Sequence, residues 1–184
     1  MKLSAIKGTN EFKLYQQKLL SLLKDLSLEK LVSGQEKLTF WINTYNLLTM
    51  YSNLCKSPSR SDPFEERLKS ARRRSFIIGG QSYSLLDIEF AVLRACKEVP
   101  DHLTDLASML PKISSEDVRF SYIVDSKDPR ILFAICKGNA SSPRIHVYHV
   151  NTVFEQLDAA ISQYLQQNIT IDDNSKTVSL QKKR

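Results

Sequence analysis

The sequence predicts an α+β fold with a central buried helix, further capped helices and short strands paired as hairpins. Three observations favour this class: one long apolar segment with helical spacing, two Ser-x-x-acid capping boxes, and a Gly-Gly turn between two short apolar runs. Helices and strands do not alternate in the regular way of a parallel sheet. With 184 residues and 42% hydrophobic content, residues 1–184 are expected to form one domain.

The segment Glu36–Leu54 predicts the central helix. It contains no glycine or proline, and its apolar residues continue almost all the way round, so little of it can face water. Glu36, Asn43 and Asn46 fall on one line of this helix and form a polar seam within the core. Because a buried amide without partners costs about 1 to 3 kcal/mol, these side chains are expected to make specific hydrogen bonds.

The N-terminal part predicts a flexible lead over residues 1–9 and then a helix from Asn10. The apolar positions of this helix follow a 3-4-3-4 spacing, and they are Phe12, Tyr15, Leu19, Leu22 and Leu26. This spacing fits the seam of a coiled coil, but it is too short for a stable zipper, so packing within its own domain is favoured over dimerisation.

Two capping boxes predict the N-termini of helices. Ser33 with Glu36 precedes the central helix, and this cap is the structural alternative to a catalytic role for Glu36. Ser84 with Asp87 precedes the next apolar helix, where Asp87 and Glu89 also suit the positive end of the helix dipole. Asp87 and Glu89 are the candidate neighbours of the polar seam.

The remaining segments predict short elements. Residues 64–74 are charged and amphipathic, which is typical of a surface helix. The other predicted elements are a hairpin over 75–84, a short helix over 99–110, an extended segment over 118–124, a buried strand over 131–136, a helix from Asn151 and a hairpin over 169–180.

Cysteines and histidines form neither a disulfide framework nor a metal site. Cys55, Cys96 and Cys136 lie far apart without a Cys-x-x-Cys pair, and His146 and His149 would point to opposite faces of a strand. We therefore expect no metal and no cofactor. The cysteine usage, and the lack of a signal peptide or membrane span, indicate the cytoplasm, with the nucleus as the alternative.

The net charge of +6 is concentrated in two places, residues 69–74 and 181–184. Arg72, Arg73 and Arg74 are the candidates for contact with an anionic partner, either nucleic acid or an anionic lipid. No nucleic-acid-binding motif accompanies them, so a solvated surface is favoured.

Three sequence blocks occur in the order and spacing of a known family. They are EKLTFWINTYN from Glu36, IGGQSYSLLDIE from Ile78 and DPRILFAICKGNASSPRI from Asp128. Through these blocks, residues 14–180 resemble the family called domain of unknown function 547. Members often follow leucine-zipper segments, DEP domains or glutaredoxin domains, so the resemblance implies an intracellular interaction or regulatory setting.

The chain departs from the family pattern at two positions. Leu132 stands where the family usually has histidine, and Ser142 where it has a second cysteine, whereas Cys136 matches the first cysteine. Because leucine cannot transfer a proton, the resemblance implies a non-catalytic module, a pseudoenzyme candidate, that binds another protein. The family usually continues with an aromatic and acidic segment, which leaves open a truncation after Arg184.

The alternative function is a thiol-dependent hydrolase or transferase with transglutaminase-like or papain-like architecture, and it rests on analogy of fold. Its candidate residues are Cys136, His146 and Glu36, because such chemistry needs a thiolate beside a base. A cysteine in an apolar run is more often an inert core thiol, so the binding module is favoured.

Overall fold

The computed structural model describes residues 9–55, 64–95, 107–108, 110–138 and 142–180. The predictions for residues 1–8, for most of the segment 99–110, for Cys96 and for the basic end 181–184 lie outside this part of the chain.

The described residues confirm the α+β class. The α-helices are α2 (Asn10–Lys24), α3 (Gly34–Cys55), α4 (Phe64–Arg73) and α5 (Val153–Asn168). The strands are β1 (Ser75–Ile78), β2 (Gln81–Ser84), β3 (Ile169–Asp172) and β4 (Thr177–Leu180), and they pair as two separate antiparallel hairpins. The tighter or wider helical segments are η1 (Leu28–Lys30), η2 (Asp87–Leu93), η4 (Val118–Tyr122), η5 (Pro129–Phe133) and η6 (Val150–Thr152).

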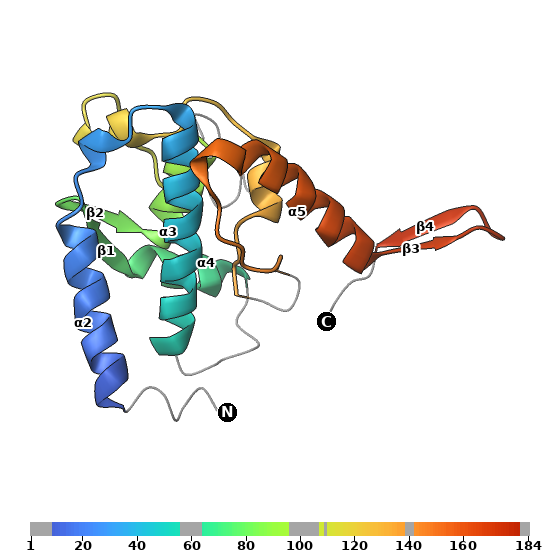
Figure 1. Ribbon diagram of the computed structural model, residues 1–184, viewed down its shortest axis with the longest axis horizontal. Helices are drawn as coiled ribbons and strands as arrows, with labels where there is room; N and C mark the ends of the chain where they lie inside the picture. Colours follow the sequence, from blue (N-terminus) through green and yellow to red (C-terminus); the bar gives the residue numbers. More distant parts are fainter. Residues whose placement is uncertain (1–8, 56–63, 96–106, 109, 139–141, 181–184) are drawn as a thin grey trace.

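Helix α3 is the central helix, as the apolar pattern predicted. It runs through the middle of the molecule between α2 and α5 (Figure 1). Trp41, Ile42 and Leu48 on this helix are fully buried. The indole N–H of Trp41 donates to the carbonyl oxygen of Tyr122 at 2.8 Å, so the one polar group of this buried ring has a partner.

Both predicted capping boxes are present. The amide of Glu36 donates to Ser33 Oγ at 3.2 Å, and the amide of Ser33 donates to Glu36 Oε2 at 2.8 Å. At the second box, the Asp87 amide donates to Ser84 Oγ at 3.0 Å and the Ser84 amide to Asp87 Oδ2 at 2.7 Å. The helix after the second box is a π-helix, η2, rather than the expected α-helix.

The β1–β2 hairpin holds the end of α2. Its register pairs Ser75 with Ser84 and Ile78 with Gln81, which leaves Gly79-Gly80 as the predicted turn. The turn amides of Gly79 and Gly80 donate to the carbonyl oxygens of Leu23 and Lys24 at 2.9 and 3.1 Å. These bonds satisfy carbonyl groups that have no partner within the last turn of a helix.

Substitution of the two turn glycines by alanine should lower the stability by different amounts. Both have positive φ, but a Cβ at Gly79 would lie 2.5 Å from Cγ of the buried Leu28, whereas a Cβ at Gly80 would meet nothing within 4 Å. We expect Gly80→Ala to lower the free energy of unfolding by about 1 kcal/mol through backbone strain alone. Gly79→Ala should cost about 2 kcal/mol, because it adds overpacking. Urea unfolding measures both values, and equal losses would contradict this account.

The predictions for two extended segments are wrong. Residues 118–124 and 131–136 were expected to be extended, but 3₁₀-helices occupy Val118–Tyr122 and Pro129–Phe133. Each helix begins within an Asp-x-Arg sequence, where the capping aspartate, Asp117 or Asp128, accepts the amide of the arginine at 2.9 Å. This local cap competes with strand formation, and an apolar run by itself does not distinguish a strand from a buried helical turn.

The predicted stripe of α2 is divided between core and solvent. Phe12 and Leu19 are buried, whereas Tyr15, Leu22 and Leu26 are exposed. At the other end of the chain, the predicted hairpin β3–β4 is confirmed, with Ile169 opposite Leu180. This hairpin projects from the end of α5, away from the rest of the molecule (Figure 1).

Candidate functional site

The polar seam of α3 binds backbone groups of two irregular segments. Asn43 Nδ2 donates to the carbonyl oxygen of Tyr148, and Asn43 Oδ1 accepts the amide of the same residue, both at 2.9 Å. Asn46 Nδ2 donates to the carbonyl oxygen of Ala134 at 3.0 Å, and Asn46 Oδ1 accepts the Cys136 amide at 2.8 Å. Each asparagine side chain thus donates one hydrogen bond to the facing backbone and accepts one from it, as the backbone of a neighbouring β-strand would.

The structure separates the predicted acidic residues into two groups. Glu36 and Asp87 lie in the capping boxes, where their carboxylates accept backbone amides. The bonds from Ser33 and then Val32 lower the pKa of Glu36, because they stabilise its charged form. Glu89 is different, since it lies buried beside α3 and accepts the hydroxyl of Tyr45 at 3.1 Å.

Glu89 is the buried centre of an ionic cluster that reaches the surface at Lys137. Its Oε1 lies 2.6 Å from Nη2 of Arg94 and 2.7 Å from Nζ of Lys137. The Arg94 guanidinium also lies over the ring of Phe90, 4.5 Å from its centroid. We call Tyr45, Glu89, Arg94 and Lys137 the Glu89 cluster. Two cations and one carboxylate give the cluster a net positive charge.

Sequence reasoning missed three members of this cluster, and the π-helix explains one of them. Glu89 and Arg94 are five residues apart, and the amide of Arg94 donates to the carbonyl oxygen of Glu89 at 3.1 Å. An α-helical pattern pairs residues three or four apart, so it gives no reason to join these two. A π-helix is rare and often marks a functional position. Tyr45 and Lys137 carried no recognisable signal in the sequence.

Burial and the neighbouring carboxylate keep the Tyr45 hydroxyl protonated. Removal of the ring from water, and then the charge of Glu89, raise the pKa of Tyr45 well above its usual range. The hydroxyl therefore acts as a hydrogen-bond donor to Glu89. The arrangement holds the Glu89 carboxylate in place through one hydroxyl and two cations.

The thiol candidates do not come together. Cys136 is half-buried in the segment that Asn46 holds, whereas His146 is exposed and its Nε2 lies 2.8 Å from Oε1 of Gln163. No hydrogen bond joins Cys136 to His146 or His149 within the described ranges. In the same part of the chain, no three His, Cys, Asp or Glu side chains are placed to hold a metal ion.

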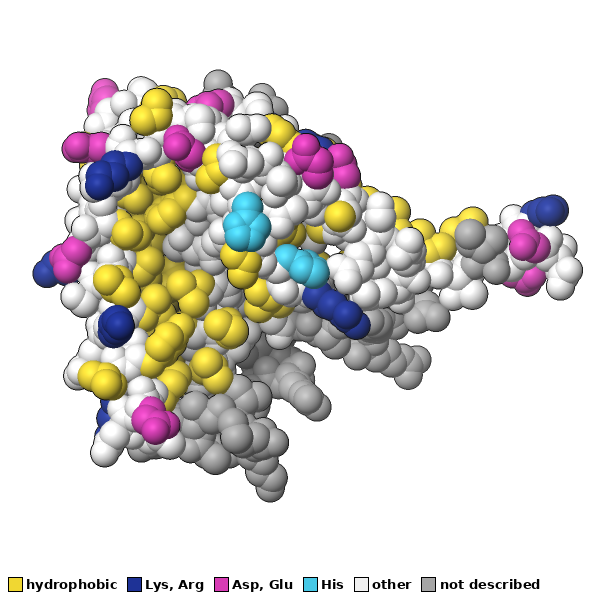
Figure 2. Space-filling model, in the orientation of Figure 1, with side chains coloured by type: hydrophobic (Ala, Val, Ile, Leu, Met, Phe, Trp, Pro, Cys, Tyr) yellow, Lys and Arg dark blue, Asp and Glu magenta, His cyan; other side chains and the backbone are white. Residues whose placement is uncertain are grey.

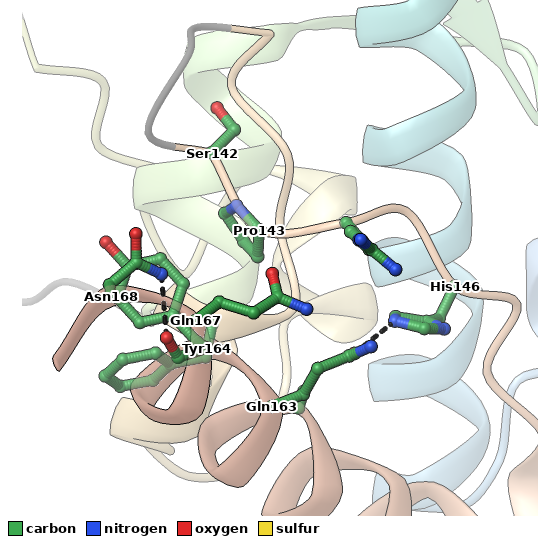
Figure 3. Close-up of a pocket in the computed structure, with 10 residues that line it drawn as sticks. Ser142, Pro143, His146, Gln163, Tyr164, Gln167 and Asn168 are labelled. Carbon is green, nitrogen blue, oxygen red and sulfur yellow. Dashed lines mark hydrogen bonds between the residues drawn. The ribbon is translucent and has the colours of Figure 1, made fainter. Parts of the chain in front are cut away.

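A shallow pocket lies where the segment from Ser142 to His146 passes α5 (Figure 3). The space that it encloses is only about 20 Å³, and the volume reaches about 330 Å³ when the open mouth is counted. Ser142, which stands at the position of the second family cysteine, is part of its lining. Sequence reasoning singled out His146 but did not predict this pocket, because half of the lining comes from α5.

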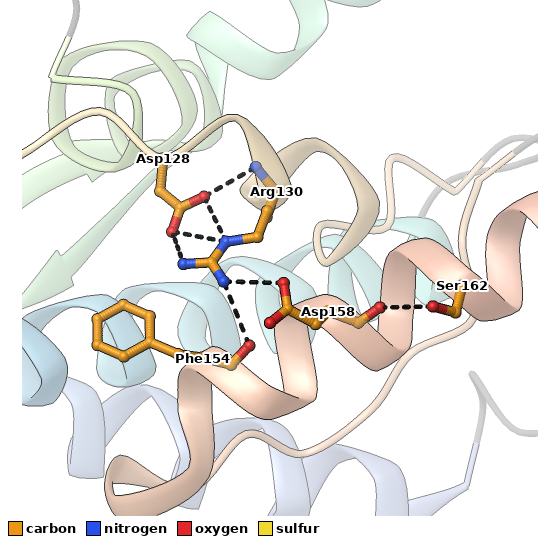
Figure 4. A network of polar contacts seen from close by, with 5 residues as sticks. All are labelled: Asp128, Arg130, Phe154, Asp158 and Ser162. Carbon is orange, nitrogen blue, oxygen red and sulfur yellow. Dashed lines mark hydrogen bonds and ion pairs between the residues drawn. The ribbon is translucent and has the colours of Figure 1, made fainter.

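Arg130 joins the Pro129–Phe133 helix to α5 (Figure 4). Its guanidinium binds Asp128 through Nη2 at 2.7 Å and Asp158 through Nη1 at 2.9 Å. It also lies over the ring of Phe154, 5.3 Å from the centroid. The hydrogen bonds from the Arg130 side chain lower the pKa of Asp128 by stabilising the carboxylate.

This network predicts a change in acid stability. Because the folded-state pKa of Asp128 is depressed, its contribution is present above the unfolded pKa, about 4, and is lost as the pH falls through the lower folded value. Arg130→Gln should therefore reduce the loss of unfolding free energy below about pH 4. Urea unfolding at several pH values measures this slope. Lys127→Gln removes a nearby exposed cation and serves as control; equal slopes in both variants would contradict the prediction.

The candidate anion-binding arginines are partly engaged within the chain. Arg72 Nη1 donates to the carbonyl oxygen of Ser108 at 3.4 Å, and Arg74 Nη1 donates to that of Ser52 at 2.9 Å. The three guanidinium groups thus do not form one free cationic surface. A role in binding nucleic acid or anionic lipid stays a prediction.

An exposed apolar face covers the side of the molecule on which α2 and α3 lie (Figure 2). We call it the α2–α3 face, and its residues are Tyr15, Leu22, Leu26, Phe40, Leu47 and Met50. Leu22 is 58% exposed, Tyr15 49% and Met50 43%. Phe40 and Leu47 are half-buried and pack against the core.

The chain matches the model of a known protein family. The model of the family described as protein of unknown function, DUF547, matches residues 29–165. No curated protein and no solved structure matches the chain. The matched part contains the polar seam and the Glu89 cluster, whereas α2 and the β3–β4 hairpin lie outside it. None of the described helices is both long and apolar enough to cross a membrane.

Proposed function

Because the chain belongs to the DUF547 family, whose function is unknown, we propose a role from its own surface: a non-catalytic module that binds an amphipathic helix of a partner protein. The observation that carries this proposal is the exposed apolar α2–α3 face. The proposed setting is intracellular, in the cytoplasm or the nucleus, where Cys136 would stay reduced.

The arrangement of the two helices favours a helical partner. α2 and α3 lie side by side and run in opposite directions (Figure 1). Each presents apolar residues at a seven-residue step, Tyr15 with Leu22 on α2 and Phe40 with Leu47 on α3. A third helix with apolar residues at i, i+4 and i+7 would bury both stripes at once.

Three features of the described residues support a non-catalytic role. Leu132, at the family histidine, is 46% exposed and cannot transfer a proton. The carboxylate of Glu89 is neutralised by Arg94 and Lys137. The Cys136 amide is held by Asn46, and no base lies within hydrogen-bond distance of its thiol among the described groups.

A selection of helical peptides tests the proposal. A displayed library of amphipathic helices is selected on the purified chain and then measured against Leu22→Glu/Met50→Glu. We expect selected peptides to carry apolar residues at helical spacing, and the double variant to lose at least about tenfold in affinity because two charges would be buried. Val178→Glu, which changes an even more exposed apolar residue on the β3–β4 hairpin, should bind normally.

Two results would reject the proposal. Selected peptides that bind the double variant and the unmodified chain equally would show that the α2–α3 face is not the docking site. Concentration-dependent association of the chain with itself, abolished by the double substitution, would assign the face to a second copy. Circular dichroism of the double variant confirms that it is folded, which is expected because both positions are exposed.

A further inference from the structure

The pocket beside α5 has an unusual balance of polar groups. Its lining contains Arg144, His146, Gln163 and Gln167, and it contains no aspartate or glutamate. Arg144 makes no ion pair or hydrogen bond with any residue that the structure describes. The pocket therefore presents hydrogen-bond donors and a positive charge without a carboxylate to compensate it.

A hydrogen bond within the lining orients two of these groups, His146 and Gln163 (Figure 3). Oε1 of Gln163 lies 2.8 Å from Nε2 of His146, so the carbonyl side of this amide is occupied and its amino group is left to donate. Gln167, one helical turn further along α5, presents a second amide at the same pocket.

Two aromatic rings form part of the pocket lining. Phe133 and Tyr164 both line it, and their rings meet edge to face with centroids 5.3 Å apart. Small-molecule sites typically combine such apolar walls with a few polar groups that fix orientation. A ligand that fits must bring negative charge for Arg144 and an apolar surface for the two rings.

We propose that this pocket binds a carboxylate group carried on a small apolar or aromatic body. A single guanidinium with neutral amide donors matches the single charge and planar shape of a carboxylate. A phosphate group carries about −1.5 to −2 charges at neutral pH and would call for more than one cation. The carboxylate can belong to a free small molecule or to the C-terminus of a peptide.

Benzoate and benzamide form a matched pair of probes, since they differ mainly in charge. NMR titration of the full chain should show benzoate shifting the signals of His146 and Gln163, with little response to benzamide. Arg144→Gln should weaken benzoate binding about tenfold, which is the usual size of one charged hydrogen bond. Lys127→Gln, an exposed cation elsewhere, should leave it unchanged. N-acetylphenylalanine then distinguishes the two sources: binding tighter than that of benzoate favours a peptide C-terminus, and weaker binding favours a free small carboxylate.

Three outcomes would overturn the proposal. Equal shifts from benzoate and benzamide would show that the pocket does not recognise the negative charge. Tighter binding of inorganic phosphate than of benzoate would assign it to another class of anion. Unchanged benzoate affinity in Arg144→Gln would place the anion elsewhere. Arg144 is exposed, so its substitution should not unfold the chain, and the retained amide spectrum verifies this.

Discussion

Glu89→Gln is expected to lower the free energy of unfolding by about 4 kcal/mol, because it leaves the largely buried Arg94 without its counter-charge. The glutamate is 5% exposed and binds Tyr45, Arg94 and Lys137. A neutral amide can still accept hydrogen bonds, but it cannot balance the charge of Arg94. Urea unfolding followed by circular dichroism measures the difference between the variant and the unmodified chain.

A matched control and a compensating variant test this explanation. Glu155→Gln removes an exposed carboxylate from the first turn of α5 and should change stability by no more than about 0.5 kcal/mol. Glu89→Leu combined with Arg94→Met and Lys137→Met should recover much of the loss, because apolar residues can replace a buried ionic group. A loss below about 1 kcal/mol for Glu89→Gln would mean that water already screens the cluster.

Asn46→Ala is expected to lower the free energy of unfolding by about 3 kcal/mol, because two backbone groups lose their partners in a buried site. These groups are the carbonyl oxygen of Ala134 and the amide of Cys136. The substitution also leaves a small cavity beside the fully buried Ala134 and Ile135. Thermal and urea unfolding both measure the loss.

Asn53 supplies the control for this prediction. It is the same residue type on the same helix, but it is exposed, so Asn53→Ala should have little effect. Asn46→Asp should be intermediate, because its carboxylate can accept the Cys136 amide but repels the Ala134 carbonyl oxygen. If Asn46→Ala and Asn53→Ala were equally stable, the hydrogen bonds of Asn46 would contribute nothing beyond those made with water.

Together these contacts describe how the segment that carries Cys136 is held. Asn46 binds its amide from one side, and Glu89 binds the next residue, Lys137, from the other. Such double attachment gives rigidity to a segment without regular structure of its own. It fits the proposed binding module, in which the polar interior maintains shape and the exposed α2–α3 face makes the contact with the partner.

The sequence by itself determined the elements whose signals are local. The capping boxes at Ser33 and Ser84 and the Gly79-Gly80 turn are made by residues within four positions of one another, so their hydrogen bonds follow from the order of the chain. The buried character of α3 was equally predictable, because apolar residues surround it. The need of Asn43 and Asn46 for partners followed from that burial.

Only the tertiary structure decided which partners those groups have. Asn43 meets Tyr148 across 105 positions, Asn46 meets Cys136 across 90, and Tyr45 meets Glu89 across 44. The apolar run 131–136 became a helical turn because Asp128 caps it, and Glu89 meets Arg94 because a π-helix places them together. Buried polar groups take whichever complementary group the packing brings within about 3 Å, and periodicity along one segment carries no information about that.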